Sequence, residues 1–330
     1  MSNTISSVGI TGLGSYVPER VLTNFDLEKM VDTSDEWIVT RTGIRERRIA
    51  ADDQAASDLA MPAALEAMAQ AGVTADDLDL IVVATVSPDS PFPATASLMQ
   101  DRLGAGRAAA FDLEAGCSGF IYALSMGSQP IAAGNMRTVL VIGTEALSKI
   151  TDWTDRATCV LLGDGAGAAV LQPVPESHGV LSFCLGSDGS GASLLHLPAG
   201  GSRLPASERT VRERLHYIQM AGNEVFKFAV RILEEAALKA VAQAGLTIDQ
   251  VKLIIPHQAN ARIMDAAAKR LNLPPESFYC NIDRYGNTSA ASIPLALHEA
   301  VKEGRVQPGD LVLLVAFGAG LTWGAVLLRW

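Results

Sequence analysis

Short apolar runs alternate with longer segments of mixed polarity along most of the chain. An apolar run bounded by polar residues or glycine predicts a buried β-strand, and apolar residues that recur every three or four positions predict a helix. The predicted strands cover residues 8–14, 108–113, 139–142, 163–170, 251–255, 311–316 and 325–329. The predicted helices cover residues 24–31, 34–39, 55–72, 118–133, 219–244 and 259–271. Strands interleaved with helices in this way indicate an α/β fold.

Several stretches between these elements lack apolar periodicity. Residues 40–48 are basic and polar, which predicts a surface loop, and Asn24 is placed to cap the helix that follows it. Residues 173–179 predict a linker, and the polar insert at residues 197–214 is expected to lie over a crevice. The glycines at 163–167 do not follow the G-x-G-x-x-G pattern, so we expect no dinucleotide site there.

The chain contains an internal repeat. Residues 71–82 match residues 244–255 at an offset of 173, and the same offset relates residues 139–142 to residues 312–315. At an offset of 170, Gly116-Cys117-Ser118 overlays Gly286-Asn287-Thr288. Repeated elements in the same order predict a duplication, with halves at residues 1–172 and 173–330. If the halves pack as a pseudo-twofold pair, the helix that starts at Cys117 faces the one that starts near Asn287.

The composition limits the class of protein. With 330 residues, of which 48% are hydrophobic, the chain can bury one large core or two moderate ones. A net charge of −10 argues against nonspecific binding to nucleic acid or to an anionic membrane. No apolar run reaches the roughly 18 residues of a membrane span, and residues 1–7 lack the features of a signal peptide. We therefore expect a cytoplasmic protein.

Cysteine usage points to one candidate nucleophile. The four cysteines are widely scattered, with no C-x-x-C pair: Cys117, Cys159, Cys184 and Cys280. This spacing predicts reduced thiols and no structural zinc site. Cys117 falls where a strand turns into a helix, and free backbone N–H groups with the helix dipole predict a lowered thiol pKa there. The same position also fits an unreactive cysteine in a core of small residues.

Two further residues occupy the ends of elements in the second half. His257 follows the strand predicted at 251–255, where open α/β sheets collect ligands, and Asn287 overlays Cys117 in the repeat. Each residue alone also fits a structural role, as a hydrogen-bonded histidine or a helix cap. A cysteine, a histidine and an asparagine together suggest covalent acyl chemistry. If His257 and Asn287 donate to a thioester carbonyl, they stabilise an enolate that attacks an acyl group on Cys117, and a glycine-rich turn at 317–320 adds a backbone N–H.

Six motifs across nearly the whole chain, at residues 31–47, around Cys117, and at 163–170, 220–227, 256–260 and 286–292, resemble one family. That family is β-ketoacyl-acyl carrier protein synthase III, the condensing enzymes that initiate bacterial type II fatty-acid synthesis within the thiolase superfamily. The resemblance implies a five-layered αβαβα thiolase fold and a homodimer. It also implies acyl-CoA and malonyl-acyl carrier protein as substrates, with no cofactor and no metal.

The resemblance assigns roles around the nucleophile. Cys117 takes an acyl group from acyl-CoA, and His257 and Asn287 promote decarboxylation of malonyl-acyl carrier protein. The backbone N–H groups of Cys117 and Ala319 form an oxyanion hole, and Phe317 lies over the nucleophile as a gate. Three departures from the family pattern are Ala319 in place of glycine, Leu321 in place of phenylalanine, and a longer insert before Met220.

The resemblance also implies contacts outside this centre. Trp37 and Arg156 are expected on the two faces of the CoA adenine. The pantetheine and phosphate path is expected to be lined by Thr33, Arg41, Asn223 and Arg262. The acyl pocket is expected to include Leu162, and Phe92 is expected to reach across the dimer into the partner's pocket.

An acidic enzyme needs a local basic patch to bind an acidic carrier protein. Two predicted helices each present basic side chains on one face, and the five residues are Lys227, Arg231, Arg262, Lys269 and Arg270. Such side chains also fit an ordinary solvated surface. We propose them as the docking patch.

Other functions remain as alternatives. A related condensing enzyme that uses a longer, aromatic or secondary-metabolite primer has the same residues. A noncatalytic partner subunit is disfavoured because the cysteine, histidine and asparagine are all present. A thiolase is expected to carry a second cysteine near the site, and residues 317–320 contain none.

Overall fold

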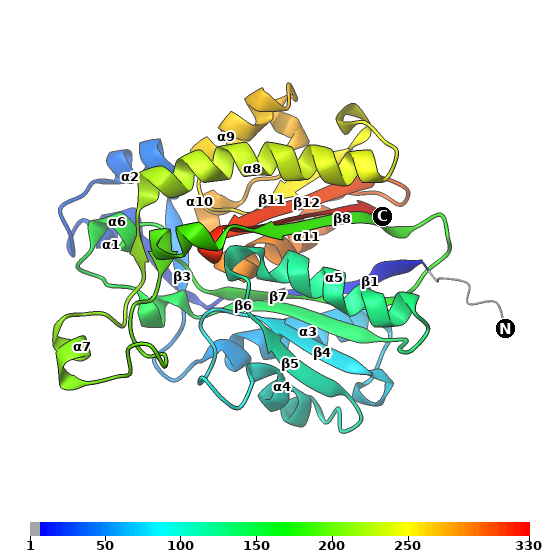
Figure 1. Cartoon of the computed structure of the whole chain (residues 1–330), viewed down its shortest axis with the longest axis horizontal. Coiled ribbons are helices and arrows are strands. Elements are labelled where there is room, and N and C mark those ends of the chain that lie inside the picture. The colour runs from blue at the N-terminus through cyan, green and yellow to red at the C-terminus, as the bar shows by residue number, and fades with distance from the viewer. Residues whose placement is uncertain (1–6) are drawn as a thin grey trace.

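The computed structural model describes residues 7–330, which form two central sheets with helices between and outside them (Figure 1). Residues 1–6, most of the stretch considered for a signal peptide, lie outside this range. The strands are β1 (Val8–Tyr16), β2 (Arg20–Thr23), β3 (Glu46–Ile49), β4 (Leu80–Ala84), β5 (Ala109–Leu113), β6 (Val139–Glu145), β7 (Gly165–Pro173), β8 (Gly179–Ser187), β9 (Leu195–His196), β10 (Gln219–Met220), β11 (Leu253–Pro256), β12 (Leu311–Gly318) and β13 (Thr322–Arg329).

The helices fall into α-helices and short 3₁₀ turns. The α-helices are α1 (Asn24–Leu27), α2 (Asp35–Thr42), α3 (Ala56–Ala71), α4 (Thr95–Leu103), α5 (Gly119–Ala132), α6 (Arg156–Cys159), α7 (Glu208–Arg212), α8 (Gly222–Gln243), α9 (Ala261–Arg270), α10 (Ile282–Tyr285) and α11 (Ser292–Lys302). The 3₁₀ turns are η1 (Ala75–Asp77), η2 (Gly116–Ser118), η3 (Leu147–Ile150), η4 (Gly189–Leu194), η5 (Ile248–Gln250), η6 (Pro275–Ser277), η7 (Ser289–Ala291) and η8 (Ala319–Leu321).

The two sheets and their helices stack as five layers. The first sheet has the strand order β1-β7-β6-β4-β5, and the second has the order β11-β12-β13-β8. Helices α5 and α11 pack between the sheets, α3 and α4 cover the outer face of the first sheet, and α8 and α9 cover that of the second. Strands β4 and β6 are therefore buried on both faces, which explains their continuous apolar sequence. This architecture confirms the five-layered αβαβα fold.

Strand pairing confirms the duplication. In the first sheet β4 lies parallel to β6 with Leu80 opposite Val139, and in the second β11 lies parallel to β12 with Leu253 opposite Val312. Both pairs of partners are related by the offset of 173 found in the sequence. The same offset aligns η2 with η7, so the counterpart of Cys117 is Ala290. The expectation that Asn287 is its counterpart is wrong, because Asn287 lies before that turn.

Most predicted elements are confirmed to within a few residues. The predicted linker joins β7 of the first sheet to β8 of the second, and the division into domains at 172 and 173 stays a prediction. The helix predicted from residue 219 starts at Gly222, because residues 219–220 form β10 and pair with β9. The insert at 197–214 contains α7 and is fixed to the body by an ion pair between Arg214 and Asp152.

The prediction of a surface loop at residues 40–48 is wrong. Residues 40–42 are the end of helix α2, and residues 46–49 form β3, which pairs with β2. Arg47 of β3 is fully buried. Its guanidinium donates to the backbone oxygens of Leu22 and Val160 at 3.2 and 2.8 Å and to Asn24 Oδ1 at 2.9 Å. A basic residue enters the interior here because these acceptors bind the N–H groups of its two terminal nitrogens, while its Nε has no partner among the described residues.

The predicted cap at Asn24 is also wrong. Thr23 is the N-cap of α1, with its side chain and that of Asp26 forming a reciprocal capping box. Asn24 is buried instead, and its amide donates to Asp35 and to the Ile44 oxygen. The polar side chain thus ties α1 to α2 and to the segment before β3.

The strand predicted at 108–113 is present but is not buried as expected. β5 is an edge strand of the first sheet, and none of its five residues is fully buried. Phe111 is 42% exposed. At the corresponding edge of the second sheet, by contrast, Ile254 of β11 is bridged to Phe278, and the Tyr279 N–H donates to the Ile254 oxygen. Periodicity marked β5 as a strand but carried no information about its neighbours.

No helix in residues 7–330 is both long and apolar enough to cross a bilayer.

Replacing Arg47 with alanine should lower the free energy of unfolding by about 3 kcal/mol, because it leaves three buried acceptors without donors and opens a cavity. Urea denaturation of Arg47→Ala measures this change. Arg45→Ala is the matched control, since Arg45 is exposed, and it should change stability by less than about 0.5 kcal/mol. Equal effects of the two substitutions would contradict the structural role of Arg47.

Candidate active site

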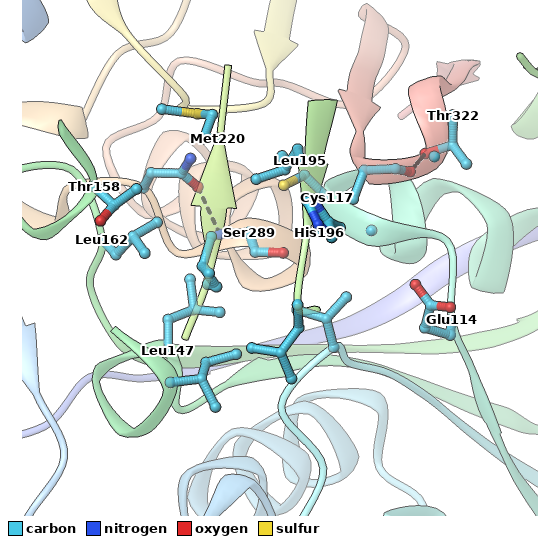
Figure 2. Close-up of a pocket in the computed structure, with 18 of the residues that line it drawn as sticks. Glu114, Cys117, Leu147, Thr158, Leu162, Leu195, His196, Met220, Ser289 and Thr322 are labelled. Atoms are coloured by element: carbon cyan, nitrogen blue, oxygen red, sulfur yellow. Dashed lines mark hydrogen bonds between the residues drawn. The ribbon is translucent and has the colours of Figure 1, made fainter. Parts of the chain in front are cut away.

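A cavity of about 480 Å³ opens where the two halves meet, at the start of α5 (Figure 2). Residues from both halves line it, including Cys117 from η2, Asn287, Ser289 from η7 and Ala319 from η8. Most of its remaining wall is apolar: Val86, Leu147, Ile150, Leu161, Leu162, Leu195, Leu197, Ile218 and Met220. Of the 197–214 insert only Leu197 lines the cavity, and Leu195 and Met220 lie outside it, so the sequence prediction that this insert covers the crevice is confirmed for its first residue alone.

Two backbone turns meet at Cys117. Gly116 has φ +55°, and a side chain there would come within 2.6 Å of the Ala319 nitrogen. A side chain at Gly318 would overlap the Cys117 nitrogen. Glycine at both positions therefore lets η2 and η8 dock backbone to backbone, with the N–H groups of Cys117 and Ala319 directed at the sulfur.

The prediction of a lowered pKa for Cys117 is wrong for the unliganded protein. The side chain is partly exposed to the cavity, but its apolar surroundings desolvate the sulfur and raise the pKa of Cys117 to about 11. The Ser289 hydroxyl and the N–H groups of Cys117 and Ala319 act in the opposite direction and lower the pKa, but burial is the larger effect. The thiol form therefore predominates at neutral pH.

His257 lies at the end of β11 and is 1% exposed. Its Nδ1 is 2.7 Å from Ser292 Oγ, and the Gln258 N–H donates to the same oxygen at 3.4 Å. Because Ser292 Oγ already accepts from Gln258, its own hydroxyl proton is available to Nδ1, which leaves the imidazole proton on Nε2. Burial lowers the pKa of His257 to about 3, so the ring is neutral. His257 lies outside the residues that line the cavity, and its ring meets Phe317 edge-on with centroids 5.4 Å apart.

Asn287 is held by backbone bonds from both sides. Its N–H donates to the Leu161 oxygen at 2.8 Å, and its own carbonyl accepts from Gly163 at 3.0 Å. The side-chain Oδ1 accepts from the Ser289 N–H at 2.9 Å, the bond drawn at Ser289 in Figure 2. With Oδ1 occupied, the Nδ2 amide is the part of Asn287 that is free to donate into the cavity.

The expected adenine-stacking residues lie together at the surface. Arg156 and Arg41 place their guanidinium carbons 4.9 and 5.5 Å from the centre of the Trp37 ring. Arg156 also donates to the Asp32 oxygen at 3.0 Å, next to Thr33, whose hydroxyl is buried without a partner in residues 7–330. The structure thus brings Trp37, Arg41, Arg156 and Thr33 into one site.

The remaining residues of the expected CoA path lie on neighbouring helices. Asn223 and Arg262 are both exposed, on α8 and α9. Asn260, the cap of α9, donates to the Arg41 oxygen at 3.1 Å and so joins the start of α9 to the end of α2. None of the six expected CoA residues lines the cavity itself, but Thr158, on the same short helix as Arg156, does. The surface site and the cavity are therefore adjacent.

The expected acyl-pocket residues are separated in the single chain. Leu162 lines the cavity and is 8% exposed, whereas Phe92 is 85% exposed and does not line it. Two departures from the family pattern can be placed. Ala319, in place of glycine, still directs its backbone N–H at the Cys117 sulfur. Leu321, in place of phenylalanine, has a backbone φ of 45°, and its side chain packs against Gly191.

The five basic residues of the expected docking patch are all exposed on α8 and α9, which pack together. Two of them are already paired, Arg231 with Glu235 at 3.2 Å and Arg270 with Glu234. Lys227, Arg262 and Lys269 form no ion pair among the described residues. The positive charge offered to a partner is therefore concentrated on these three.

Three residues beside the site were not singled out from the sequence. Ser292 positions His257, Ser289 lines the cavity next to Cys117, and Glu145 is fully buried at the end of β6. Both serines lie in a motif that was noted, but a serine among small residues gives no local signal. The signal for Glu145 was available, since a carboxylate close after a buried apolar run marks the edge of the sheet where ligands collect.

Two family profiles match the chain. Residues 111–189 match the family described as 3-oxoacyl-[acyl-carrier-protein (ACP)] synthase III, and residues 241–330 match its C-terminal region. The first range contains Cys117, and the second contains His257 and Asn287.

Whole-chain relatives agree with the profiles. The chain is 64% identical over 326 residues to β-ketoacyl-[acyl-carrier-protein] synthase III of Symbiobacterium thermophilum, with 99% of each chain covered. Among solved structures, the Thermus thermophilus synthase III is 54% identical with a TM-score of 0.92, covering 98% of this chain and 99% of that one. The Aquifex aeolicus 3-oxoacyl-[acyl-carrier-protein] synthase III is 51% identical with a TM-score of 0.91, covering 98% and 100%.

Proposed function

The chain belongs to the 3-oxoacyl-[acyl-carrier-protein] synthase III family, and from this premise we propose how its residues carry out a decarboxylative Claisen condensation. The enzyme takes an acyl group from acyl-CoA and joins it to the two-carbon unit released from malonyl-acyl carrier protein. The product is a 3-oxoacyl-acyl carrier protein, which starts type II fatty-acid synthesis. The observation that supports this assignment most strongly is that a thiol, an amide and two backbone N–H groups from both halves meet at one apolar cavity.

Cys117 is the nucleophile of the first step. Its sulfur attacks the thioester carbonyl of acyl-CoA, and negative charge develops on the carbonyl oxygen. The N–H groups of Cys117 and Ala319 stabilise that oxygen, because the docked turns hold them in place before the substrate arrives. CoA leaves, and the acyl group remains on Cys117.

His257 and Asn287 act in the second step. A neutral imidazole with its proton on Nε2 and an amide with a free Nδ2 are both hydrogen-bond donors. Together they hold the thioester carbonyl of malonyl-acyl carrier protein and stabilise the enolate formed when CO₂ leaves. The enolate carbon then attacks the acyl group on Cys117. A protonated, cationic histidine is not needed, which agrees with the pKa of His257 at about 3.

The primer enters an apolar space. The cavity wall around Leu162 is made of aliphatic side chains, which suits a saturated acyl chain. A primer of secondary metabolism is the second candidate, and a priming ketosynthase of the R1128 polyketide pathway is 37% identical to this chain. The relatives from Symbiobacterium thermophilum and Desulfitobacterium hafniense, at 64% and 59% identity, are named β-ketoacyl-[acyl-carrier-protein] synthase III, which favours the fatty-acid role.

Acyl-CoA reaches the cavity from the site around Trp37. An indole and a guanidinium both stack on a purine face, so Trp37 and Arg156 hold the adenine, and Arg156 moves off the ring to admit it. The phosphates and pantetheine of CoA are then contacted by Thr33, Arg41, Asn223 and Arg262. Lys227, Arg262 and Lys269 attract the acidic carrier protein at the neighbouring surface.

The enzyme acts as a homodimer. The edge of β5 carries the exposed Phe111, and Phe92 and Met126 are also exposed apolar residues, on the segment before α4 and on α5, which packs beside β5. An open strand edge next to apolar side chains is the kind of surface that a second copy covers. In that arrangement Phe92 enters the partner's acyl pocket. We also place the enzyme in the cytoplasm, because its four cysteines are unpaired.

Cys117→Ala should abolish acyl-enzyme formation and leave decarboxylation of malonyl-acyl carrier protein measurable, since His257 and Asn287 remain. Mass spectrometry of the protein after incubation with acetyl-CoA detects the acyl group. Cys280→Ala is the matched control, because Cys280 is exposed and outside the cavity, and it should acylate normally. Label that still attaches to Cys117→Ala would show the assignment to be wrong.

Charge reversal at Arg262 and Lys269 should raise KM for malonyl-acyl carrier protein about ten-fold or more, with a far smaller effect on a small malonyl thioester. The single variant Lys269→Glu separates docking from the CoA contact of Arg262. Lys239→Glu, on α8 outside the patch, is the control and should leave both KM values near those of the wild type. Equal increases for both malonyl substrates would refute the docking patch.

Phe111→Glu should convert the dimer to a monomer, because it buries a charge in the contact. Sedimentation equilibrium measures the change, with the wild type expected at twice the chain mass of 34.7 kDa. Phe25→Glu alters another exposed apolar residue, on α1, and should remain dimeric. A monomeric wild type would rule the arrangement out.

A further inference from the structure

Glu145 is a buried carboxylate beside the nucleophile that the condensation scheme does not use. It is fully buried and forms no ion pair among residues 7–330. Its oxygens accept from Ser87 Oγ at 2.5 Å, from the Val86 N–H at 3.1 Å and from the Ala290 N–H at 3.4 Å, with Thr85 Oγ1 at 3.3 Å. A carboxylate held only by neutral donors in the interior is costly to keep charged, and burial raises the pKa of Glu145 to about 7.

The turn η7, which carries Ser289, packs against both η2, which carries Cys117, and β6, which ends at Glu145. The Ser289 hydroxyl is buried and has no partner of full hydrogen-bond geometry in the described residues, yet it lies close enough to lower the pKa of both Cys117 and Glu145. The residue is held at φ 46°, a left-handed conformation that serine rarely adopts. Its N–H donates to Asn287 Oδ1, which fixes the turn. Strain of this kind persists where the surroundings require one orientation.

Cys117 needs a proton acceptor, since its thiol form predominates. His257 does not fill this role, because its Nδ1 already accepts from Ser292 and its pKa is lowered to about 3. Among the groups that shift the pKa of Cys117 most, Glu145 is the one ionisable side chain. The loop at residues 85–87 and η7 present only hydroxyl and N–H groups to it.

We propose that Glu145 accepts the Cys117 proton through the Ser289 hydroxyl during acylation, holds it while the acyl-enzyme exists, and returns it when the sulfur is released. This inference rests on the proposed role of Cys117 as the nucleophile. Glu145 acts through Ser289 and does not touch the substrate.

The proton balance of the two steps is consistent with this relay. In the first, the S–H bond of Cys117 breaks, the new S–C bond forms, Glu145 gains the proton, and CoA leaves as a thiolate that is protonated by water. In the second, the malonyl carboxylate leaves as CO₂, the enolate carbon bonds to the acyl carbon, and the S–C bond breaks. The Cys117 sulfur then takes back the proton from Glu145. One proton is consumed from solvent in each cycle.

The relay also keeps the charge in the cavity constant. A Cys117 thiolate beside an ionised Glu145 would place two negative charges in a low-dielectric space, and the Glu145 charge raises the pKa of Cys117 for that reason. Transfer of the proton from Cys117 to Glu145 leaves one negative charge before and after. The two groups therefore titrate as a coupled pair.

The test is single-turnover acylation of Cys117 by acetyl-CoA as a function of pH. In the wild type the rate should rise with pH through about 7, as Glu145 ionises, and then level off. Glu145→Gln, which keeps the size of the side chain, should slow acylation about a hundred-fold at pH 7. Its rate should keep rising to the highest pH tested, because the thiol then loses its proton only to solvent. Ser289→Ala should show the same loss and the same profile.

A control and a second readout separate this role from a structural one. Thr85→Val removes a hydroxyl that donates to Glu145 but does not line the cavity, and it should keep the acylation rate within about three-fold. Malonyl decarboxylation needs no thiol proton, so Cys117→Ala/Glu145→Gln should decarboxylate as fast as Cys117→Ala, whereas a damaged fold loses both reactions.

Three outcomes overturn the relay: wild-type acylation kinetics in Glu145→Gln or Ser289→Ala, faster acylation in Glu145→Gln, or equal loss of decarboxylation in the double variant. Failure of the wild type to acylate Cys117 would refute the proposed function instead.

Discussion

The contact between η2 and η8 is the constraint on which the site depends. Two stretches of backbone approach so closely that Gly116 and Gly318 have no room for a side chain, and the approach aims two N–H groups at one sulfur. Because these donors belong to the main chain of two sheets, their positions are fixed by the five-layered core and not by side-chain rotamers. The same core positions Asn287 and His257 from the second half.

Burial governs the chemistry of the groups around that contact. A helix start by itself favours a thiolate, but the aliphatic wall of the cavity outweighs it at Cys117. The same desolvation keeps His257 neutral and brings Glu145 near the point of half-ionisation. Before the reaction the site therefore holds a neutral thiol, a neutral imidazole and at most the one negative charge of Glu145.

The sequence predicted the fold and the candidate site to different depths. Apolar periodicity and the repeat located most strands and helices, because each reflects burial against a sheet that repeats along the chain. Periodicity failed at Arg47, where alternate side chains of a short strand face the interior, and at β5, whose exposure depends on what lies beside it. The family resemblance supplied the roles proposed for Cys117, His257 and Asn287. It did not supply Ser289 or Glu145, whose relation to the sulfur arises only when distant segments pack together.

The duplicated halves differ at one edge of each sheet. Residues 278–279 lie beside β11 in the second sheet as β5 lies beside β4 in the first, but they form a single bridge and no strand, whereas β5 is a full strand whose outer edge is open. Two identical strand edges that pair about a twofold axis cover each other, so neither remains open to a third molecule. For copies of the chain to add on without limit, each copy would need a second open edge, for example at β11. Residues 278–279 cover β11 on that side.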